Sequence, residues 1–533
     1  MAPVWKSILM LALAGMFQAS SAGRAPKFYP DDPIQTMPPP VDVGQPLVQK
    51  VNRVYDFMKQ SRHSDPRPLA PAEAINTLGD VPDSEWFTNR HGLRRMNRAE
   101  LQLGPGPAEG PQPPFTIISG KSEGVSDGFR FEDSKGRSYF AKVDPIGFPE
   151  LATAADVIAS KFLYAVGYNT PQNEIVCLKL SDLRLSDSAK ISLSRGRSRK
   201  MAWNDVKELA EDAHHYSDGT FRIVASLAVE GEYVGPFRYE GTRSDDPNDI
   251  TPHEKRRDLR GLYVFSAWLN NTDTRAGNTL DAVVERNGNR FIRHYLIDFG
   301  SALGSHGNRP KDAPAGHEFA LLPPSETIER ILTLGLDPTK WELASYRVKP
   351  DVGLFESKLF QPDDWKSGFP NPAFLSRLPD DDYWAAKQVM AFTDDDIRAL
   401  VETGRYSNPR SSEYVIDTLA KRRDKIGRTF FAKVLALDHF RVENDELLFD
   451  DLAVKYGFRS PRPYEVRWHR FDNISRTQDL IPGSGSTRLP DEAKQAAPGS
   501  YFSALIVALD DLSKLSVYVR KEGNHFKVIG IDR

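Results

Sequence analysis

The sequence contains the motif Asp273-Thr274-Arg275-Ala276-Gly277-Asn278 and, one hairpin-length insert later, Asp298-Phe299-Gly300. Together they supply an acid, an amide five positions further on, and a second acid behind an apolar strand. These are the groups with which a phosphoryl-transfer site holds a nucleophile and a metal ion. A fold that assembles such a site is therefore the leading hypothesis for this chain.

Upstream of these motifs, a glycine-bearing loop connects two predicted strands. The strands are expected at 115–118 and 129–131, and the loop between them includes Lys121, Gly124 and Gly128. Glycines let backbone N–H groups approach phosphates closely, and Lys121 would add a positive charge. We therefore expect these three residues to contribute to nucleotide binding, although an ordinary glycine-rich hairpin would have the same pattern.

The next predicted strand and helix supply a lysine and an acid. Lys142 lies on a strand at 138–144, beside the glycine loop, and this position favours a phosphate-binding lysine over a surface one. Glu150 opens a helix that runs to about Val166. A carboxylate in the first turn is favoured by the helix dipole, but Glu150 could also pair with Lys142 and orient it. Asp156 is the reserve candidate for that pairing.

A second predicted helix leads the chain to the first motif. It begins with a capping box at 251–254, and Asp273 follows its end. Asp273 can reach Asn278 only if the loop is curled, which Gly277 permits. We expect Asp273 to accept or orient an attacking hydroxyl, and Asn278 and Asp298 to bind magnesium. For any one of these residues, a loop side chain in an Asx turn is the alternative.

At Asn271-x-Asp273, at the Asp273 to Asn278 spacing and at Asp298-Phe299-Gly300, the chain resembles the protein-kinase-like superfamily. It is most similar to atypical branches such as the HipA toxin kinases and phosphatidylinositol kinases, over about residues 115–304. It departs from the eukaryotic pattern because the histidine of the catalytic-loop triplet is absent. Glu150 also follows Lys142 at less than half the usual spacing.

The resemblance implies a bilobal α+β fold with a β-rich N-terminal lobe and a helical C-terminal lobe. It implies ATP and Mg²⁺ as cofactors, with Lys142 on the nucleotide phosphates and Glu150 pairing with it. It further implies Asp273 as the catalytic acid, and Asn278 and Asp298 as the magnesium ligands.

Composition narrows the choice of partners. The 533 residues, 40% hydrophobic and 10% aromatic, are enough for one large or two to three ordinary domains. The 70 basic and 73 acidic residues are interspersed and leave a net charge of −3, which does not favour nucleic acid as the main partner. A nucleotide with a protein or small-molecule acceptor fits better. The single cysteine, Cys177, rules out an internal disulfide, and we expect it to be a buried small side chain.

The N-terminus predicts export. Lys6, an apolar run at 8–17 and the small residues Ser20-Ser21-Ala22 have the pattern of a cleavable signal peptide covering residues 1–22. The run is too short for a stable membrane span, which needs about 20 apolar residues. We therefore expect a periplasmic or secreted protein; a buried N-terminal helix is the alternative.

The remaining organisation follows from changes in composition along the chain. We expect a Pro-rich extension and linker at 23–114, a kinase-like N-lobe at 115–240 and a C-lobe at 241–455. Alternating strands from 456 to 533 predict a small β module. Residues 180–199 are charged and Ser-rich and suggest an exposed insertion, and the run 421–423 suggests a solvated helix face.

These features favour an ATP- and Mg²⁺-dependent phosphotransferase that acts on a protein, lipid or sugar hydroxyl. Because ATP is scarce outside the cytoplasm, the predicted leader keeps a second hypothesis open. That hypothesis is an exported, non-catalytic kinase-like protein that binds a nucleotide or a partner. Nucleotidyl transfer at the same site is a further possibility.

Overall fold

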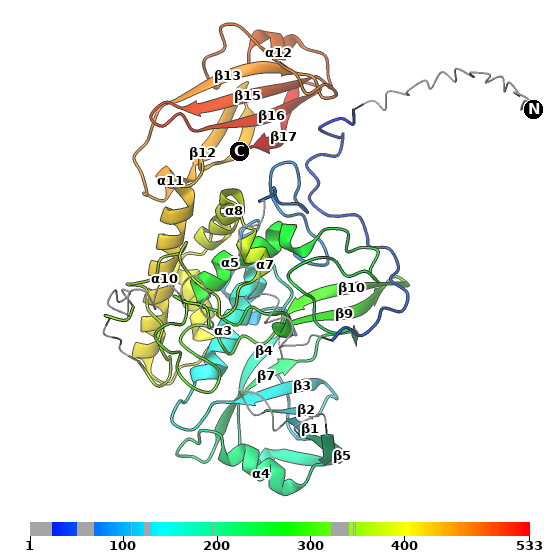
Figure 1. The fold of residues 1–533 in the computed structure, drawn as a ribbon, viewed down its shortest axis with the longest axis vertical. Coiled ribbons are helices and arrows are strands. Elements are labelled where there is room, and N and C mark those ends of the chain that lie inside the picture. Colours follow the sequence, from blue (N-terminus) through cyan, green and yellow to red (C-terminus); the bar gives the residue numbers. More distant parts are fainter. Residues whose placement is uncertain are drawn as a thin grey trace, which may run out of the picture.

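The computed structural model describes residues 24–50, 69–107, 109–121, 128–193, 197–320, 341–344, 346 and 348–533. The predicted leader lies outside these residues. The described chain is a mixed α+β structure with one large sheet, smaller sheets and several helices. The large sheet and the C-terminal sheet lie at opposite ends of the long axis, with helices between them (Figure 1). No helix among the described residues is both long enough and apolar enough to cross a membrane.

A seven-stranded sheet with the order β4-β7-β3-β2-β1-β5-β6 forms one end of the molecule. Its strands are β1 (Phe115–Lys121), β2 (Gly128–Glu132), β3 (Ser138–Val143), β4 (Asn173–Leu178), β5 (Leu183–Leu193), β6 (Arg197–Lys200) and β7 (Phe221–Leu227). Alternate residues of the strands, such as Phe131 and Tyr139, share one face, where α4 (Trp203–Glu211) packs over them. Cys177 on β4 is exposed, so the expectation of a buried cysteine was wrong.

The segment expected to be an exposed insertion, 180–199, belongs to this sheet. Strand β5 pairs in parallel with β1, and β6 pairs with β5 as the outer strand. Ala189 and Ile191 are buried in the hydrophobic cluster of the sheet. The charged residues that suggested an insertion occupy solvent-exposed positions of β5 and β6.

Helix α3 (Leu151–Val166) packs against this sheet, and all of its residues except Tyr164 are buried. Its alanine-rich sequence lets neighbouring elements approach closely. Asp144 caps its start, because Oδ1 accepts hydrogen bonds from the backbone N–H groups of Ala152 (2.9 Å) and Thr153 (3.0 Å). The helix is therefore fixed in place at its N-terminal end.

The middle of the molecule is helical. Its elements are α2 (Arg98–Leu103), η3 (His253–Lys255), α5 (Arg257–Leu269), η4 (Ala276–Asn278), α7 (Pro372–Leu375), α8 (Pro379–Met390), α9 (Asp394–Glu402), α10 (Pro409–Phe431) and α11 (Leu452–Lys455). Two short helical segments lie elsewhere: η1 (Leu180–Asp182) between β4 and β5, and α12 (Asp491–Gln495) between two strands near the C-terminal end of the chain. The predicted capping box at 251–254 is not formed. The 3₁₀ turn η3 has Pro252 at its N-cap without a side-chain hydrogen bond, and Glu254 accepts a hydrogen bond from the N–H of Gly241 (2.7 Å) instead. The extended backbone of Arg256 separates η3 from α5. All residues of α5 are buried.

The predicted hairpin after the first motif is present. Strands β9 (Thr279–Arg286) and β10 (Asn289–Leu296) pair through the turn residues Asn287 and Gly288, which have positive φ angles of 55° and 76°. This conformation is typical of a type I′ turn. Strand β8 (Glu232–Tyr233) adds to β9, and the register pairs Thr279 with Leu296. The residues just before β9 and just after β10 therefore emerge at the same end of the hairpin.

The C-terminal end of the chain forms a five-stranded antiparallel sheet with the order β14-β13-β15-β16-β17. Its strands are β13 (Tyr464–Phe471), β14 (Gln478–Leu480), β15 (Tyr501–Ala508), β16 (Lys514–Glu522) and β17 (His525–Asp532). A hairpin of β11 (Leu437–Glu443) and β12 (Glu446–Asp451) shares its hydrophobic cluster through Leu437 and Leu447. The sheet thus packs with residues that precede the expected boundary at 456.

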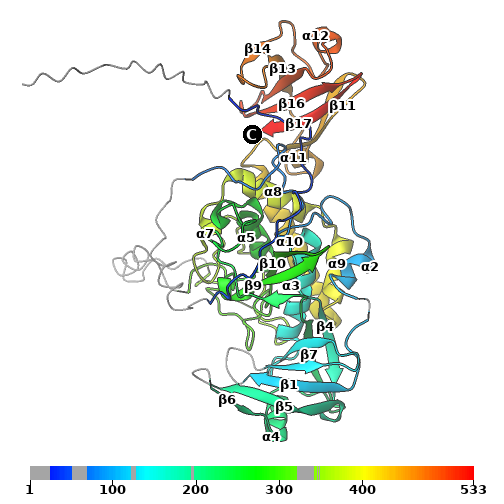
Figure 2. The same cartoon turned by 90° about the vertical axis from the view of Figure 1, so that its right-hand side faces the viewer.

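The N-terminal segment, expected to be a Pro-rich extension, lies along the body of the protein. Phe28 packs between Phe471 and Tyr518 of the C-terminal sheet, and Asn473 hydrogen-bonds to both the N–H and the carbonyl of Phe28. Further along, the N–H of Val43 donates to the carbonyl of Arg290 in the β9–β10 hairpin. Figure 2 shows this segment running from the C-terminal sheet toward the hairpin. It therefore connects two parts of the molecule.

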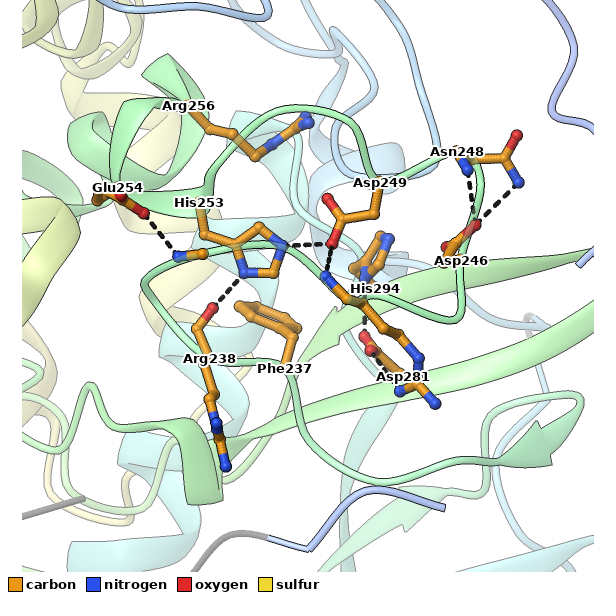
Figure 3. Close-up of polar contacts among 12 residues, drawn as sticks. Phe237, Arg238, Asp246, Asn248, Asp249, His253, Glu254, Arg256, Asp281 and His294 are labelled. Atoms are coloured by element: carbon orange, nitrogen blue, oxygen red, sulfur yellow. Dashed lines mark hydrogen bonds and ion pairs between the residues drawn. The ribbon is translucent and has the colours of Figure 1, made fainter. Parts of the chain in front are cut away.

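A buried polar cluster fixes the loop between β8 and α5 to the hairpin (Figure 3). Arg243 donates from Nη1 to Asp281 Oδ2 (3.2 Å). The other carboxylate oxygen of Asp281 lies 2.7 Å from Nδ1 of His294, and Asp249 Oδ2 lies 2.8 Å from Nε2 of His253. Burying these charges would be costly if they were unpaired, so their mutual contacts specify one position for the loop.

Phe28 provides a test of the N-terminal contact. Phe28→Ala removes a ring that is 98% buried, and we expect the free energy of unfolding to fall by about 3 kcal/mol. Thermal unfolding should show the loss as a lower melting temperature. Tyr29→Ala is the control, because the Tyr29 side chain is exposed and such changes stay within about 0.5 kcal/mol. Equal melting temperatures for the two variants would contradict this contact.

Candidate active site

Lys142 lies between two carboxylates. Its Nζ is 2.6 Å from Oδ1 of Asp298 and 3.3 Å from Oδ2 of Asp156. Strand β3 supplies the lysine, α3 supplies Asp156, and the loop after β10 supplies Asp298. Burial alone would lower the pKa of Lys142, but Asp298 and Asp156 outweigh it and raise the pKa above its ordinary value. The lysine is therefore charged at neutral pH.

Asp156 is the acid that orients Lys142. Its Oδ1 accepts a hydrogen bond from Nδ2 of Asn173 (2.6 Å), and its carboxylate also accepts one from the backbone N–H of Phe299. Burial raises the pKa of Asp156, and Lys142 only partly offsets this effect. Asp156 thus joins the lysine strand, the helix and the second motif. It is the only acidic residue between Leu151 and Val166, which is the sequence signal that could have ranked it first.

The prediction that Glu150 pairs with Lys142 is corrected by this geometry. Glu150 precedes the first turn of α3 with a positive φ of 67°, and its carboxylate is directed elsewhere. It accepts hydrogen bonds from the backbone N–H of Ser407 (2.8 Å) and from the hydroxyl of Tyr216 (3.2 Å). The acid that contacts Lys142 of β3 is Asp156, which lies further along the helix. Glu150 instead fixes the loop before α10.

The hairpin brings the two sequence motifs together. The N–H of Ile297 donates to the carbonyl of Asn278 (3.0 Å), which places Asp298 beside the start of β9. Nδ2 of Asn278 donates to the backbone carbonyl of Asp273 (2.7 Å), so the loop is curled as Gly277 permits. The Asn278 side chain and the half-exposed carboxylate of Asp298 therefore lie at the same end of the hairpin.

Arg275 holds the carboxylate of Asp273, a role that the sequence did not reveal. Nε of Arg275 lies 2.8 Å from Oδ1 of Asp273, and Nη2 lies 3.1 Å from Oδ2. One hydrogen bond from Nη2 and one ion-pair contact at Nε thus hold the carboxylate against the guanidinium group. The Asp273 carboxylate remains partly exposed and can be reached by another molecule.

The glycine loop is described in part. Gly124 and the side chain of Lys121 lie outside the described residues. Gly128 pairs directly with Lys142 across β2 and β3. A Cβ atom at Gly128 would lie 2.6 Å from the carbonyl oxygen of Ala141, so a side chain would not fit there. The backbone of Gly128 therefore lies close to strand β3, which carries Lys142.

Arg422, expected on a solvated face, is buried against the end of α5. It donates from Nε to the carbonyl of Trp268 (3.0 Å) and from Nη2 to that of Ala267 (2.5 Å). Burial lowers the pKa of Arg422 to about 9. Its neighbour Lys421 is exposed, as predicted. Arg422 therefore binds the helix end that precedes the Asp273 loop.

A divalent metal ion would fit the pair formed by Asn278 and Asp298. The described residues contain no group of three or more His, Cys, Asp or Glu side chains that could enclose a metal. Mg²⁺ does not need such a cage, since it keeps several waters and is held by one or two carboxylates together with substrate phosphates. The donor set here suits a metal ion that arrives with a phosphate ligand.

Comparison with known proteins gives limited similarity. No family model and no curated protein matches the sequence. Among solved structures, the Helicobacter pylori proinflammatory kinase CtkA is similar at 10% identity and a TM-score of 0.30, covering 62% of this chain and 96% of its own. The Golgi casein kinase with Mn/ADP bound has 9% identity and a TM-score of 0.29, covering 60% and 72%. Hydra Fam20 with sugar has 10% identity and a TM-score of 0.29, covering 60% and 86%. TM-scores of 0.30 or less carry no argument about function, so the function proposed below is based on the geometry of the site.

A double-mutant cycle tests the Lys142–Asp156 contact. We expect Lys142→Met to cost about 3 kcal/mol of unfolding free energy, because it leaves the 98%-buried Asp156 carboxylate without a cation. Asp156→Asn in the same chain should recover part of the loss, with a coupling energy of about 1–3 kcal/mol in denaturant unfolding.

Glu150→Gln is the matched control for this cycle, because Glu150 is an equally buried acid at the start of α3. Its effect should add to that of Lys142→Met within about 0.5 kcal/mol. Strong coupling of Lys142 to Glu150 and none to Asp156 would restore the original prediction.

Proposed function

We propose that the protein is an ATP- and Mg²⁺-dependent phosphotransferase of the atypical kinase type. The observation that carries the proposal is the position of Lys142 between Asp156 and Asp298, at the end of the hairpin that also presents Asn278. Asp273 is joined to this group through Asn278. A cation, two metal-binding oxygens and a separate acid are the requirements of phosphoryl transfer.

The first part of the site would bind the nucleotide. Lys142 now contacts Asp298, and phosphate oxygens would take the place of that carboxylate while Asp156 keeps the ammonium group oriented. Asn278 and Asp298 would hold the Mg²⁺ ion. The bound ion would supply positive charge that neutralises the phosphate oxygens. Lys121, Gly124 and Gly128 would cover the phosphates from the glycine loop.

Asp273 would act on the acceptor. Its carboxylate is oriented by Arg275 and accessible to a hydroxyl group, whose proton it would accept as the hydroxyl oxygen bonds to the transferred phosphorus. The bond from that phosphorus to the ADP oxygen breaks in the same step. We propose a protein, lipid or sugar hydroxyl as the acceptor.

We further propose a bilobal arrangement for this function. The seven-stranded sheet with α3 would be the N-lobe, the layer around α5 and α10 the C-lobe, and the C-terminal sheet an added module that could contact a partner. The separate hydrophobic clusters of the large sheet, the helical layer and the C-terminal sheet support three parts, and α3 joins the first two because most of its buried apolar residues belong to the cluster of the helical layer. Lys142 in the N-lobe and Asp298 in the C-lobe would face each other across the boundary between the two lobes.

Export remains part of the proposal. N-terminal sequencing of the protein purified from its native host should find Gly23 as the first residue, because Ser20-Ser21-Ala22 has the small residues that signal peptidase prefers. Detection of Met1 in the purified protein would contradict cleavage. An exported enzyme would need a supply of ATP outside the cytoplasm.

Nucleotide-dependent stabilisation tests the function. MgATP at about 100 times its dissociation constant should add about 2.7 kcal/mol to the stability of the wild type. Asp298→Ala should lose the resulting shift in melting temperature because it removes a metal ligand. Asp273→Ala should keep the shift and lose about 10²-fold or more of the transfer of labelled γ-phosphate.

Glu150→Gln is again the control and should keep both the shift and the transfer. The absence of a shift in the wild type would overturn nucleotide binding. A shift without transfer to any acceptor would favour the non-catalytic binding protein, and transfer of label from the α-phosphate would favour nucleotidyl transfer.

A further inference from the structure

Two buried cations meet the C-terminal end of α5, but they differ in what else they bind. Arg422 bonds to Ala267 and Trp268 of the helix and to the carbonyl of Glu356. Lys311 donates from Nζ to the carbonyl of Asn270 (2.6 Å), which caps the helix. The last carbonyls of a helix lack partners within it and form the negative end of its dipole, so cations are favoured there.

Lys311 also bonds to the loop that follows Asp298. Its Nζ donates to the carbonyl oxygens of Ser301 (2.6 Å) and Leu303 (3.0 Å). The two segments contact each other directly as well, because the N–H of Leu303 donates to the carbonyl of Leu269 (2.7 Å). Lys311 therefore connects the start of the Asp273 loop to the end of the Asp298 loop.

The contacts of Lys311 suit an ammonium group. A protonated lysine has three N–H donors, and three carbonyl oxygens converge on this one. A neutral amine has only two N–H donors, so it could bond to two of the three carbonyls, and Leu303 would keep only its hydrogen bond from Nδ2 of Asn270. Burial lowers the pKa of Lys311 well below its ordinary value, Arg422 acts in the same direction, and Asp273 opposes them. The charged form is thus held by the carbonyls and is sensitive to pH.

We propose that Lys311 is a positioning residue for phosphoryl transfer, which fixes Asp273 at its working distance from Asp298. This inference rests on the proposed function. Asp273 would bind the acceptor and Asp298 the metal with the nucleotide, so their separation sets the alignment of the reacting atoms. A misplacement of about 1 Å at a reacting centre can cost about 10²-fold in rate.

Lys311→Met, which keeps a long side chain but removes the three hydrogen bonds, tests this role, with Arg422→Met as the matched control. Both changes remove a buried cation from the same helix end, but only the first removes hydrogen bonds to the loop at 301–303. We expect kcat for γ-phosphate transfer to fall about 10²-fold in Lys311→Met and to stay within about threefold of wild type in Arg422→Met. The MgATP-induced shift in melting temperature should persist in Lys311→Met, because Lys142, Asp156 and Asp298 are held by other contacts.

The pH profile adds a readout that a purely structural role would not move. The wild-type kcat should fall at a pH below the ordinary lysine value of about 10.4, as Lys311 loses its proton. Lys142 does not produce this decline, because its pKa is raised. Arg422→Met should retain the decline and Lys311→Met should lack it. The wild-type profile can be measured even if Lys311→Met does not fold.

Different outcomes separate the two proposals. Transfer by the wild type together with equal kcat values for Lys311→Met and Arg422→Met would overturn the positioning role alone. A wild-type kcat that stays constant up to about pH 10.4 would do the same. No transfer by the wild type with any acceptor would overturn the phosphotransferase proposal and this inference with it.

Discussion

The ion pair that Lys142 makes with Asp156 and Asp298 is the contact on which the rest of the site depends. It joins a strand of the large sheet, a buried helix and the loop after a hairpin, so all three must be placed correctly for it to form. The packing agrees with this requirement. Asp144 fixes the start of α3, and the type I′ turn fixes the register that returns Asp298 to the side of Asn278.

Charge is balanced differently on the other side of the site. There, α5 ends in a loop that carries Asp273, and the cations that meet this end are paired with backbone carbonyls instead of carboxylates. This arrangement leaves the Asp273 carboxylate to Arg275 and to solvent. A salt bridge from Lys311 or Arg422 to Asp273 would have compensated their burial more fully, but it would have occupied the group that is proposed to act on the acceptor.

Local patterns in the sequence predicted much of this correctly. The Asn-Gly turn, the strand of Lys142 and the curled loop between Asp273 and Asn278 each depend on residues that are close in sequence. The choice of Asp156 over Glu150 depends on how α3 is rotated over the sheet, which spacing alone does not determine. The burial of Arg422 and the pairing of β5 with β1 depend on segments far away in the chain. No local pattern in residues 24–50 indicated that the N-terminal segment packs along the body.

That N-terminal segment has a consequence for how the chain is made. Phe28 packs against Tyr518, and the N–H of Ile531 bonds to the carbonyl of Thr77, so residues synthesised early complete a sheet whose contacting strands, β16 and β17, are synthesised more than 400 residues later. Contacts between such distant positions form slowly, because the intervening chain must first be ordered. Until β16 and β17 exist, Phe28 has no apolar surface of that sheet to cover. The C-terminal sheet is therefore closed only once β16 and β17 have been synthesised, and until then the residues around Phe28 lack the contacts that hold them to the body.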